Sequence, residues 1–222
     1  SHGPAPVVVF RDEHMIVLDK PAGMPVSATR ETVFGTAQRW VEVELGQPYV
    51  ALHHRLDREA RGLLAVGVSQ AANPGLARAF SERIAERRYR ALLDGVVVGD
   101  EGVWHHRLVE EGRLRWAAPP NEHSDDKEMK AGWRLLERQG ARSLVEVTLE
   151  TGRTHQIRLQ AAATGAPVLG DSLYGTSHPA GLHLQAFALR LPHPVTGDEL
   201  RFELPAPVEW TPNALRTEAT EP

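Results

Sequence analysis

Two short apolar runs, separated by a polar turn, open the chain. Residues 7–10 and 15–18 are apolar and residues 11–14 are polar, which predicts a hairpin of two strands, the first of them buried. The next segment, 20–25, contains two prolines and a glycine and therefore interrupts regular structure. A continuous apolar run at 63–68 has the length of a strand. The first third of the chain is thus predicted to be rich in β-structure.

Two segments, 36–45 and 74–86, carry apolar residues at the three- and four-residue steps that are typical of a helix. A third helix is predicted at 154–164, ended by Gly165. Residues 89–98 are predicted to form a strand, and so are residues 144–150, where apolar and polar positions alternate.

Two polar stretches separate or follow these elements. Residues 117–130 are predicted to form an exposed, mobile loop. The tail after Pro205 is rich in Pro, Thr and Glu and is predicted to fray.

The order of these elements indicates the fold class. Strands and helices alternate irregularly, and several predicted strand pairs are neighbours in the sequence. This pattern favours an α+β fold, in which a mixed, mostly antiparallel central sheet carries flanking helices. The length of 222 residues suits one domain with a sizeable core.

The composition narrows the class of protein. The chain has no cysteine, which excludes disulfides and thiolate metal sites. It has neither an apolar run of about 20 residues nor a signal segment at its start, so we expect a cytoplasmic protein. The net charge of −4 weighs against a surface covered with phosphate-binding charge. Nucleic-acid binding would therefore require a local basic cleft, and arginine, which greatly outnumbers lysine here, suits such contacts. A GC-rich genome would produce the same bias.

Two polar clusters are candidates for chemistry. In the first, 53–58, Arg55 and Arg58 flank Asp57, and their positive charge favours the ionised carboxylate. In the second, 151–158, a strand ends at a glycine and a helix then begins with arginine, which faces an unfavourable helix dipole there. Taken separately, the clusters also fit a loop salt bridge and a solvated helix surface.

Together and in this order, the clusters resemble the RluA-type pseudouridine synthases. His54-Arg55-Leu56-Asp57-Arg58 with Gly62-Leu63-Leu64 resembles the catalytic motif of that family, and Gly152-Arg153-Thr154-His155-Gln156-Ile157-Arg158 resembles its second signature. The similarity extends to further segments: 19–23, 88–92, 165–167, 170–175, 182–183 and 193–197. It implies a single catalytic domain over 7–207, with terminal segments 1–6 and 208–222 and without the N-terminal RNA-binding module that many relatives carry.

The resemblance also implies roles for individual residues. Asp57 would be the catalytic carboxylate, Tyr89 would stack on the extruded uracil, and Arg158 would pair with Asp57. Among substrate-binding residues, Ile157 would form a pocket wall. Arg55 would fill the gap that the flipped nucleotide leaves.

Other basic residues are less clearly assigned. Arg153, at the start of the second signature, is also expected to bind substrate. Further candidate phosphate contacts, most of which we expect to be ordinary solvated charges, are Lys20, Arg83, Arg87, Arg88 and Arg90.

One departure from the family pattern lies beside the catalytic motif. The family usually has a Thr-Ser pair before the glycine, where this chain has Ala60 and Arg61. Arg61 is expected to add bulk and charge at the catalytic loop. This departure motivates an alternative function, a non-catalytic RNA-binding protein that keeps the fold.

The expected function is isomerisation of uridine in structured ribosomal or transfer RNA, with RNA as the partner, and the protein is expected to be a monomer. A carbohydrate or nucleoside hydrolase would need a second carboxylate at a suitable distance, and none lies in a comparable motif. We expect no cofactor and no metal, because the adjacent histidine pairs lack the spacing of a zinc site.

Overall fold

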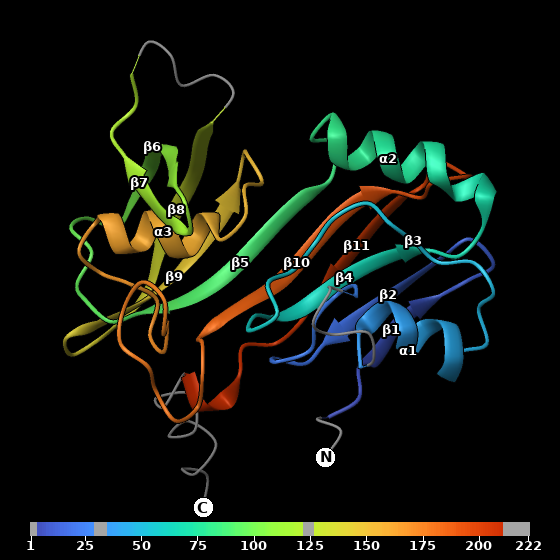
Figure 1. Cartoon of the computed structure of the whole chain (residues 1–222), viewed down its shortest axis with the longest axis horizontal. Coiled ribbons are helices and arrows are strands. Elements are labelled where there is room, and N and C mark those ends of the chain that lie inside the picture. Colours follow the sequence, from blue (N-terminus) through green and yellow to red (C-terminus); the bar gives the residue numbers. More distant parts are fainter. Residues whose placement is uncertain (1–3, 29–34, 122–126, 211–222) are drawn as a thin grey trace, which may run out of the picture.

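The computed structural model describes residues 4–28, 35–121 and 127–210. One sheet of eleven strands runs through the whole molecule (Figure 1). The strands are β1 (Val7–Arg11), β2 (Met15–Lys20), β3 (Ala51–Leu52), β4 (Arg61–Gly67), β5 (Glu86–Leu93), β6 (Glu101–Glu111), β7 (Leu114–Ala118), β8 (Glu128–Gln139), β9 (Arg142–Leu149), β10 (Leu184–Pro192) and β11 (Glu199–Glu203). The helices are α1 (Ala37–Glu44), α2 (Asn73–Ser81) and α3 (Gln156–Ala163), with 3-10 turns η1 (Gln70–Ala72) and η2 (Val208–Trp210).

The strand order is β1-β2-β4-β10-β5-β9-β8-β6-β7, with β11 also paired to β10 and β3 to β4. Among the described residues, neighbouring strands are antiparallel except β4 with β10, where Gln185 pairs with Arg61 and Ala186 with Gly62. Gly62 has a φ of +118°, and a Cβ there would lie 2.2 Å from the carbonyl oxygen of Ala186. Glycine therefore permits this close parallel contact. The predicted mixed, mostly antiparallel sheet with flanking helices is confirmed.

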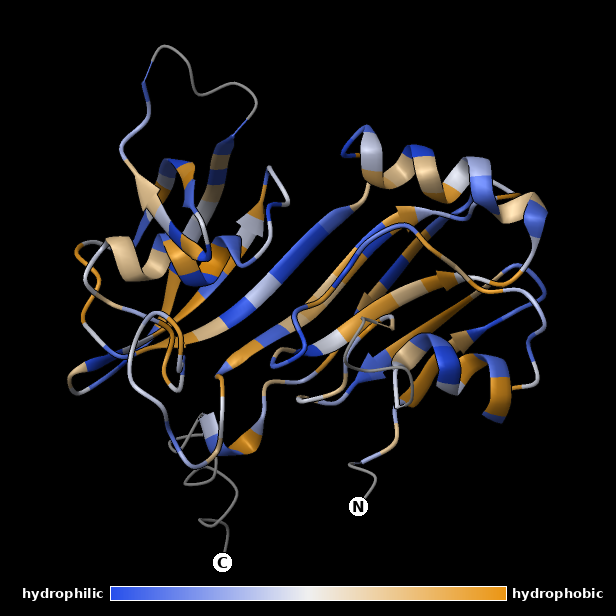
Figure 2. Ribbon diagram, in the orientation of Figure 1, coloured by the Kyte–Doolittle hydropathy of each residue, from blue (hydrophilic) through white to orange (hydrophobic). Residues whose placement is uncertain are grey.

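Two apolar cores form because alternate residues of a strand point to opposite faces of the sheet. Ile16 and Leu18 of β2 pack in a core that includes residues of α1 and α3. Met15 and Val17 pack in a second core with Leu76 of α2. Figure 2 shows the resulting mixture of hydrophobic and hydrophilic positions along the central strands.

The predicted N-terminal hairpin is confirmed by the antiparallel pairing of β1 and β2. The prediction that its first strand is buried was wrong, because Val7 is 62% exposed on the edge strand β1. Apolar residues occur on exposed surfaces too, so a short apolar run does not by itself indicate burial.

The helix predicted at 36–45 is confirmed as α1, and the Thr36 side chain accepts a hydrogen bond from the N–H of Arg39. The helix predicted at 74–86 is shorter, because Arg83 has a φ of +59° and strand β5 begins at Glu86. The helix predicted at 154–164 begins only at Gln156, after His155 with a φ of +56°. A positive φ cannot be accommodated within a helix, and neither residue is the glycine that usually marks such a position.

The second half of the chain contains more strands than expected. The strand predicted at 89–98 starts three residues earlier and ends at Leu93. The long hairpin of β6 and β7 and the strands β10 and β11 were not predicted. Part of the predicted loop at 117–130 is strand, since β7 reaches Ala118 and β8 begins at Glu128; residues 122–126 lie outside the described residues.

The tail ends differently from the prediction as far as it is described. Trp210 in η2 is buried and does not belong to a frayed segment, whereas residues 211–222 lie outside the described part. Among the residues that the structure describes, no helix has the length and apolar character needed to cross a membrane.

Candidate active site

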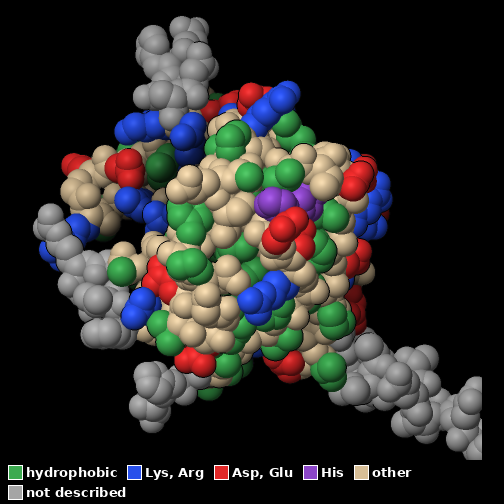
Figure 3. Space-filling model, turned by 90° about the vertical axis from the view of Figure 1, so that its right-hand side faces the viewer, with side chains coloured by type: hydrophobic (Ala, Val, Ile, Leu, Met, Phe, Trp, Pro, Cys, Tyr) green, Lys and Arg blue, Asp and Glu red, His purple; other side chains and the backbone are tan. Residues whose placement is uncertain are grey.

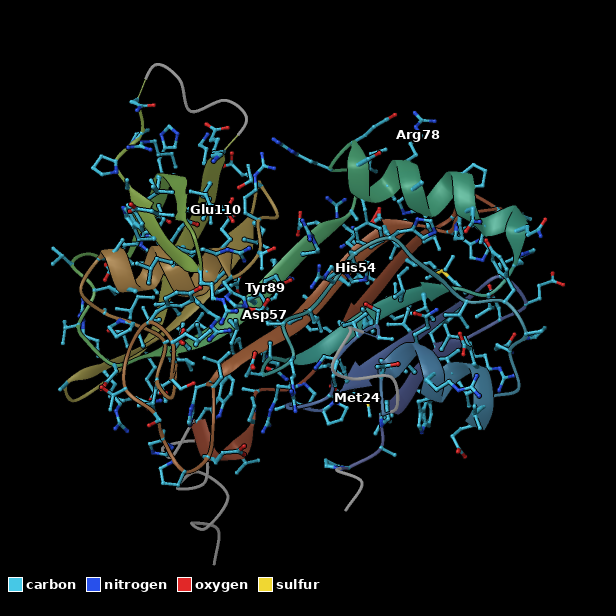
Figure 4. The ribbon with its side chains drawn as sticks, in the orientation of Figure 1. Met24, His54, Asp57, Arg78, Tyr89 and Glu110 are labelled. Carbon is cyan, nitrogen blue, oxygen red and sulfur yellow. The ribbon has the colours of Figure 1, made fainter. Side chains whose placement is uncertain are left out.

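The loop between β3 and β4 carries Asp57 to the centre of the molecule (Figure 4). A tight turn within the loop is closed by a hydrogen bond from the N–H of Ala60 to the carbonyl oxygen of Asp57, 3.1 Å long. The carbonyl oxygen of Arg58 accepts a second bond of 2.7 Å from the N–H of Gly23. These bonds fix the backbone on both sides of the Asp57 side chain.

Lys20 adds a third restraint from inside the protein. Its Nζ donates to four backbone carbonyl oxygens, those of Pro21, Met24, Arg58 and Ala60, at 2.7–3.2 Å. The side chain is fully buried, and burial lowers the pKa of Lys20 to about 8. The predictions of a phosphate contact or a solvated charge at Lys20 were therefore wrong. It holds the loop of Asp57 against the segment after β2.

Arg158 of α3 lies behind Asp57 and is only 1% exposed. Its guanidinium makes two short bonds to the carboxylate of Asp171, Nε to Oδ2 at 2.9 Å and Nη2 to Oδ1 at 2.7 Å. Its remaining Nη1 lies 3.7 Å from Oδ2 of Asp57 and 3.5 Å from Oε2 of Glu59. The expected approach of Arg158 to Asp57 is thus present, but the main partner of the arginine is Asp171.

Burial dominates the electrostatics of Asp57. Loss of solvent raises the pKa of this carboxyl group, whereas His155, Arg158 and Arg55 act in the opposite direction. Glu59 raises it further through its like charge. The expectation that nearby positive charge favours the ionised form of Asp57 agrees with the effects of Arg158 and Arg55, but burial outweighs them, because a carboxylate is costly to remove from water.

His155 is a site residue that the sequence analysis did not select. Its Nε2 lies 4.0 Å from Oδ1 of Asp57, and its Nδ1 lies 2.8 Å from the hydroxyl of Tyr174. Burial lowers the pKa of His155 even though Asp57 raises it. A neutral imidazole in contact with Tyr174 at one nitrogen can face Asp57 with the other. Only its place in the second signature marked this residue.

A cavity of about 780 Å³ opens in front of Asp57. Its walls include all the predicted site residues except Arg158: Arg55, Asp57, Tyr89, Arg153 and Ile157. Tyr89 is 6% exposed, and burial raises the pKa of its hydroxyl. The fold therefore brings these five residues together at one cavity, and Arg158 lies beside them, 3.7 Å from Asp57.

Arg61 points away from this cavity. Its guanidinium lies 5.6 Å from the centre of a Trp210 ring and 3.3 Å from Oε1 of Glu209. Ala60, by contrast, lines the cavity. The side chain of Arg61 thus lies against the turn η2 and does not add the predicted bulk or charge to the cavity. Among the described residues, no group of three or more His, Cys, Asp or Glu side chains is arranged to hold a metal ion.

Comparisons with known proteins agree with this geometry. The family model described as RNA pseudouridylate synthase matches residues 14–163. Ribosomal large subunit pseudouridine synthase D of Nitrosomonas europaea is 34% identical over 90% of this chain and 62% of its own length. An uncharacterized RNA pseudouridine synthase of Zymomonas mobilis is 33% identical over 76% of this chain and 78% of its own length.

One solved structure has a closely similar fold. Human RNA pseudouridylate synthase domain containing 1 aligns with a TM-score of 0.76 and 25% identity, covering 91% of this chain and 84% of that one. The chain spans about three fifths of the length of the ribosomal relatives that it matches.

Proposed function

This chain belongs to the RNA pseudouridylate synthase family, and we propose that it isomerises uridine to pseudouridine in structured ribosomal or transfer RNA with Asp57 as its catalytic carboxylate. One observation carries the proposal: a carboxylate 20% exposed, at the wall of a large cavity, faces a buried arginine that is already held by another carboxylate. The family membership supplies the reaction, and the cavity supplies a place for it.

The reaction exchanges one bond of the nucleoside for another. The bond between the ribose C1′ and the uracil N1 breaks, the detached uracil turns, and a bond forms between C1′ and C5. The hydrogen of C5 leaves as a proton and N1 gains a proton, so that product and substrate have the same composition. No oxidant, reductant or second substrate is needed.

Asp57 serves this exchange in its ionised form. A carboxylate can stabilise or trap positive charge that develops at the sugar, as in glycoside hydrolysis. It can also act by attack on the base or by assisting formation of a glycal. Arg158 and His155 oppose the effect of burial on the pKa of Asp57, and they thereby help to keep the carboxylate charged in its partly buried position.

The cavity walls suit a detached pyrimidine. Tyr89 would stack on the uracil, and Ile157 would form the opposite apolar surface. Water must be kept from the sugar while the base is free. Arg55 would occupy the gap that the extruded nucleotide leaves in the RNA, because a planar guanidinium can replace part of the lost stacking.

The distribution of charge supports binding of RNA on the cavity face. In Figure 3 the end of the molecule that faces the viewer carries acidic and basic side chains interspersed, whereas Lys and Arg side chains gather near the hollow at the left of that view. A local basic face on a protein of net charge −4 agrees with recognition through the backbone and shape of a structured RNA. We infer that the enzyme acts in the cytoplasm and as a monomer.

The test uses RNA labelled with tritium at C5 of its uridines, prepared from cells that lack this gene. Wild-type protein is expected to release tritium, because C5 becomes the carbon attached to the sugar. Asp57→Asn is expected to reduce the release by a factor on the order of 10³ or more. Asp94→Asn, at an exposed carboxylate with an arginine partner 3.6 Å away, is the matched control and should behave as the wild type.

Other outcomes would favour other functions. Release of free uracil would indicate a hydrolase. Binding of the RNA without release of tritium, while a related synthase releases it from the same preparation, would favour the non-catalytic RNA-binding protein.

A further inference from the structure

Successive arginines of strand β5 have opposite surroundings. Arg87 and Tyr89 both line the cavity, as expected for residues two positions apart on one face of a strand. Arg88 and Arg90 lie instead over the ring of Phe187, at 5.2 and 3.8 Å from its centre. Figure 2 shows the hydrophilic first half of this strand. Neighbouring residues of the same type thus belong to two different environments.

The two environments differ in how they neutralise the arginines. Arg88 lies 3.1 Å from a carboxylate oxygen of Glu146, and Arg90 donates a bond of 2.8 Å to the carbonyl oxygen of Leu204. The backbone of Arg87 pairs with Leu189 in the sheet, but its side chain has neither an ion pair nor a hydrogen bond to any residue of the described chain. A guanidinium carries five N–H donors, so Arg87 presents unused donors and an unbalanced positive charge to the cavity.

Gly152 makes room for this guanidinium. A Cβ at Gly152 would lie 2.8 Å from Nη2 and 3.3 Å from Nη1 of Arg87. Gly152 is not among the glycines with positive φ, so the backbone there does not itself require glycine. The absent side chain allows the head group of Arg87 to lie directly against the loop between β9 and α3, at the first residue of the second signature.

Three further arginines line this cavity. They are Arg55, Arg83 and Arg153, and none of them has an ion-pair partner in the described part of the chain. The acidic residue Glu150 on the same wall is paired with Lys130 at 3.1 Å. Four arginines and two carboxylates, those of Asp57 and Glu150, thus line the cavity, and its wall is positive on balance.

We propose that the guanidinium of Arg87, held against Gly152, binds a backbone phosphate of RNA next to the uridine that enters the cavity. This inference rests on the proposed function, since the uridine must reach Asp57 for its phosphate to lie near Tyr89 and Arg87. A planar fork of donors matches two phosphate oxygens. Arg87 is thus a substrate-binding residue that the glycine of the signature positions.

The test measures binding, so that it does not depend on catalysis. The probe is a fluorescently labelled RNA hairpin with uridines in its loop, titrated by anisotropy at several KCl concentrations. Arg87→Met is expected to raise the Kd by roughly tenfold or more, as for loss of a hydrogen bond to a charged group. The slope of log Kd against log salt should fall by the amount that about one phosphate contact contributes. Arg87→Lys should keep most of the salt dependence but not all of the affinity.

Gly152→Ala tests whether Gly152 matters because it leaves room for the guanidinium of Arg87 or for another reason. The added methyl group should displace the guanidinium and raise the Kd in the wild-type background, and it should have no further effect when Arg87 is already Met. Arg88→Met is the matched control on the other face of β5 and should leave both Kd and salt slope unchanged. Thermal melting of each variant shows that the protein remains folded.

An unchanged Kd and salt slope for folded Arg87→Met would overturn the inference. So would an equal effect of Gly152→Ala in both backgrounds. The tritium assay on the wild type decides separately whether the protein is a synthase, so failure of the phosphate site and failure of the proposed function remain distinguishable.

Discussion

Two buried cations reach the loop of Asp57 from opposite halves of the sheet. Lys20 comes from β2 and is surrounded by backbone carbonyl oxygens. Arg158 comes from α3 and is surrounded by carboxylates, chiefly that of Asp171. Each is at most 1% exposed, so neither can rely on water to balance its charge.

The two environments have opposite effects on the cations. Burial lowers the pKa of Lys20 to about 8, and no carboxylate lies within ion-pair distance of its Nζ in the described residues. Burial also opposes the charge of Arg158, but the hydrogen bonds and charge of Asp171 outweigh that effect and raise its pKa. Lys20 therefore orders the backbone of the loop, whereas Arg158 provides a permanent charge for the side chain of Asp57.

Asp171→Asn, which removes the charge of the main partner of Arg158, should have the largest effect on stability. The substitution leaves Arg158 buried with its bidentate partner neutralised, which typically costs about 3–5 kcal/mol of stability. Arg158 is also expected to move toward Asp57 and Glu59, and synthase activity should fall with stability. The free energy of unfolding, measured in urea at pH 7, tests the expectation.

Asp94→Asn is again the matched control, because Asp94 and its partner Arg142 are each 43% exposed. It should change stability by no more than about 1 kcal/mol. If Asp171→Asn were equally mild, water or Glu59 would be satisfying Arg158, and the carboxylate network would not be the feature that holds it.

Lys20→Met should have a smaller effect, with a different dependence on pH. It leaves buried carbonyl oxygens without a donor, at a cost of about 1–3 kcal/mol near pH 7. The pKa of Lys20 is about 8 in the folded protein and about 10.4 in an unfolded chain. Between these values the folded state binds fewer protons than the unfolded state, so the wild type gains stability as pH rises.

Urea unfolding of wild type and Lys20→Met at pH 7 and pH 9.5 measures this difference. The deficit of the variant should widen by on the order of 1–2 kcal/mol at the higher pH. A deficit that stays constant would mean that the four carbonyl oxygens keep Lys20 protonated, and the two cations would then be more alike than their pKa directions indicate.

The comparison also shows what the sequence could predict about the fold. Apolar spacing correctly placed α1, β2, β4 and β9, because their patterns are set by burial on one or two faces of a sheet. The end of α2 and the start of α3 were misplaced, because Arg83 and His155 have positive φ values that the local sequence does not indicate. The hairpin of β6 and β7 was missed because its burial is partial and irregular.

The site could be predicted as far as its residues lie in motifs that are recognisable in the sequence. The two motifs and the segment 88–92 identified five residues that line one cavity. The burial of Lys20, the pairing of Arg158 with Asp171 and the seat of Arg87 against Gly152 were not predictable, because each depends on segments that meet only after folding. Type and position of a charged residue do not reveal whether its partner is water, a carbonyl group or a carboxylate.

A third cation near the loop, Arg61, is the exposed counterpart of the two buried ones, and its removal should have the smallest effect. Its contacts are a partly exposed ion pair with Glu209 and a position over the Trp210 ring, which together contribute about 0.5–1 kcal/mol in such settings. Arg61→Ala should therefore lower stability by about that amount and leave tritium release unchanged, because the side chain points to η2 and not into the cavity. A large loss of activity in a stably folded Arg61→Ala protein would instead show that this position controls the catalytic loop. In that case the departure from the family's Thr-Ser pair would bear directly on catalysis. Exposure of a cation would then not predict how strongly it affects the loop of Asp57, and Arg61 would resemble Lys20 and Arg158.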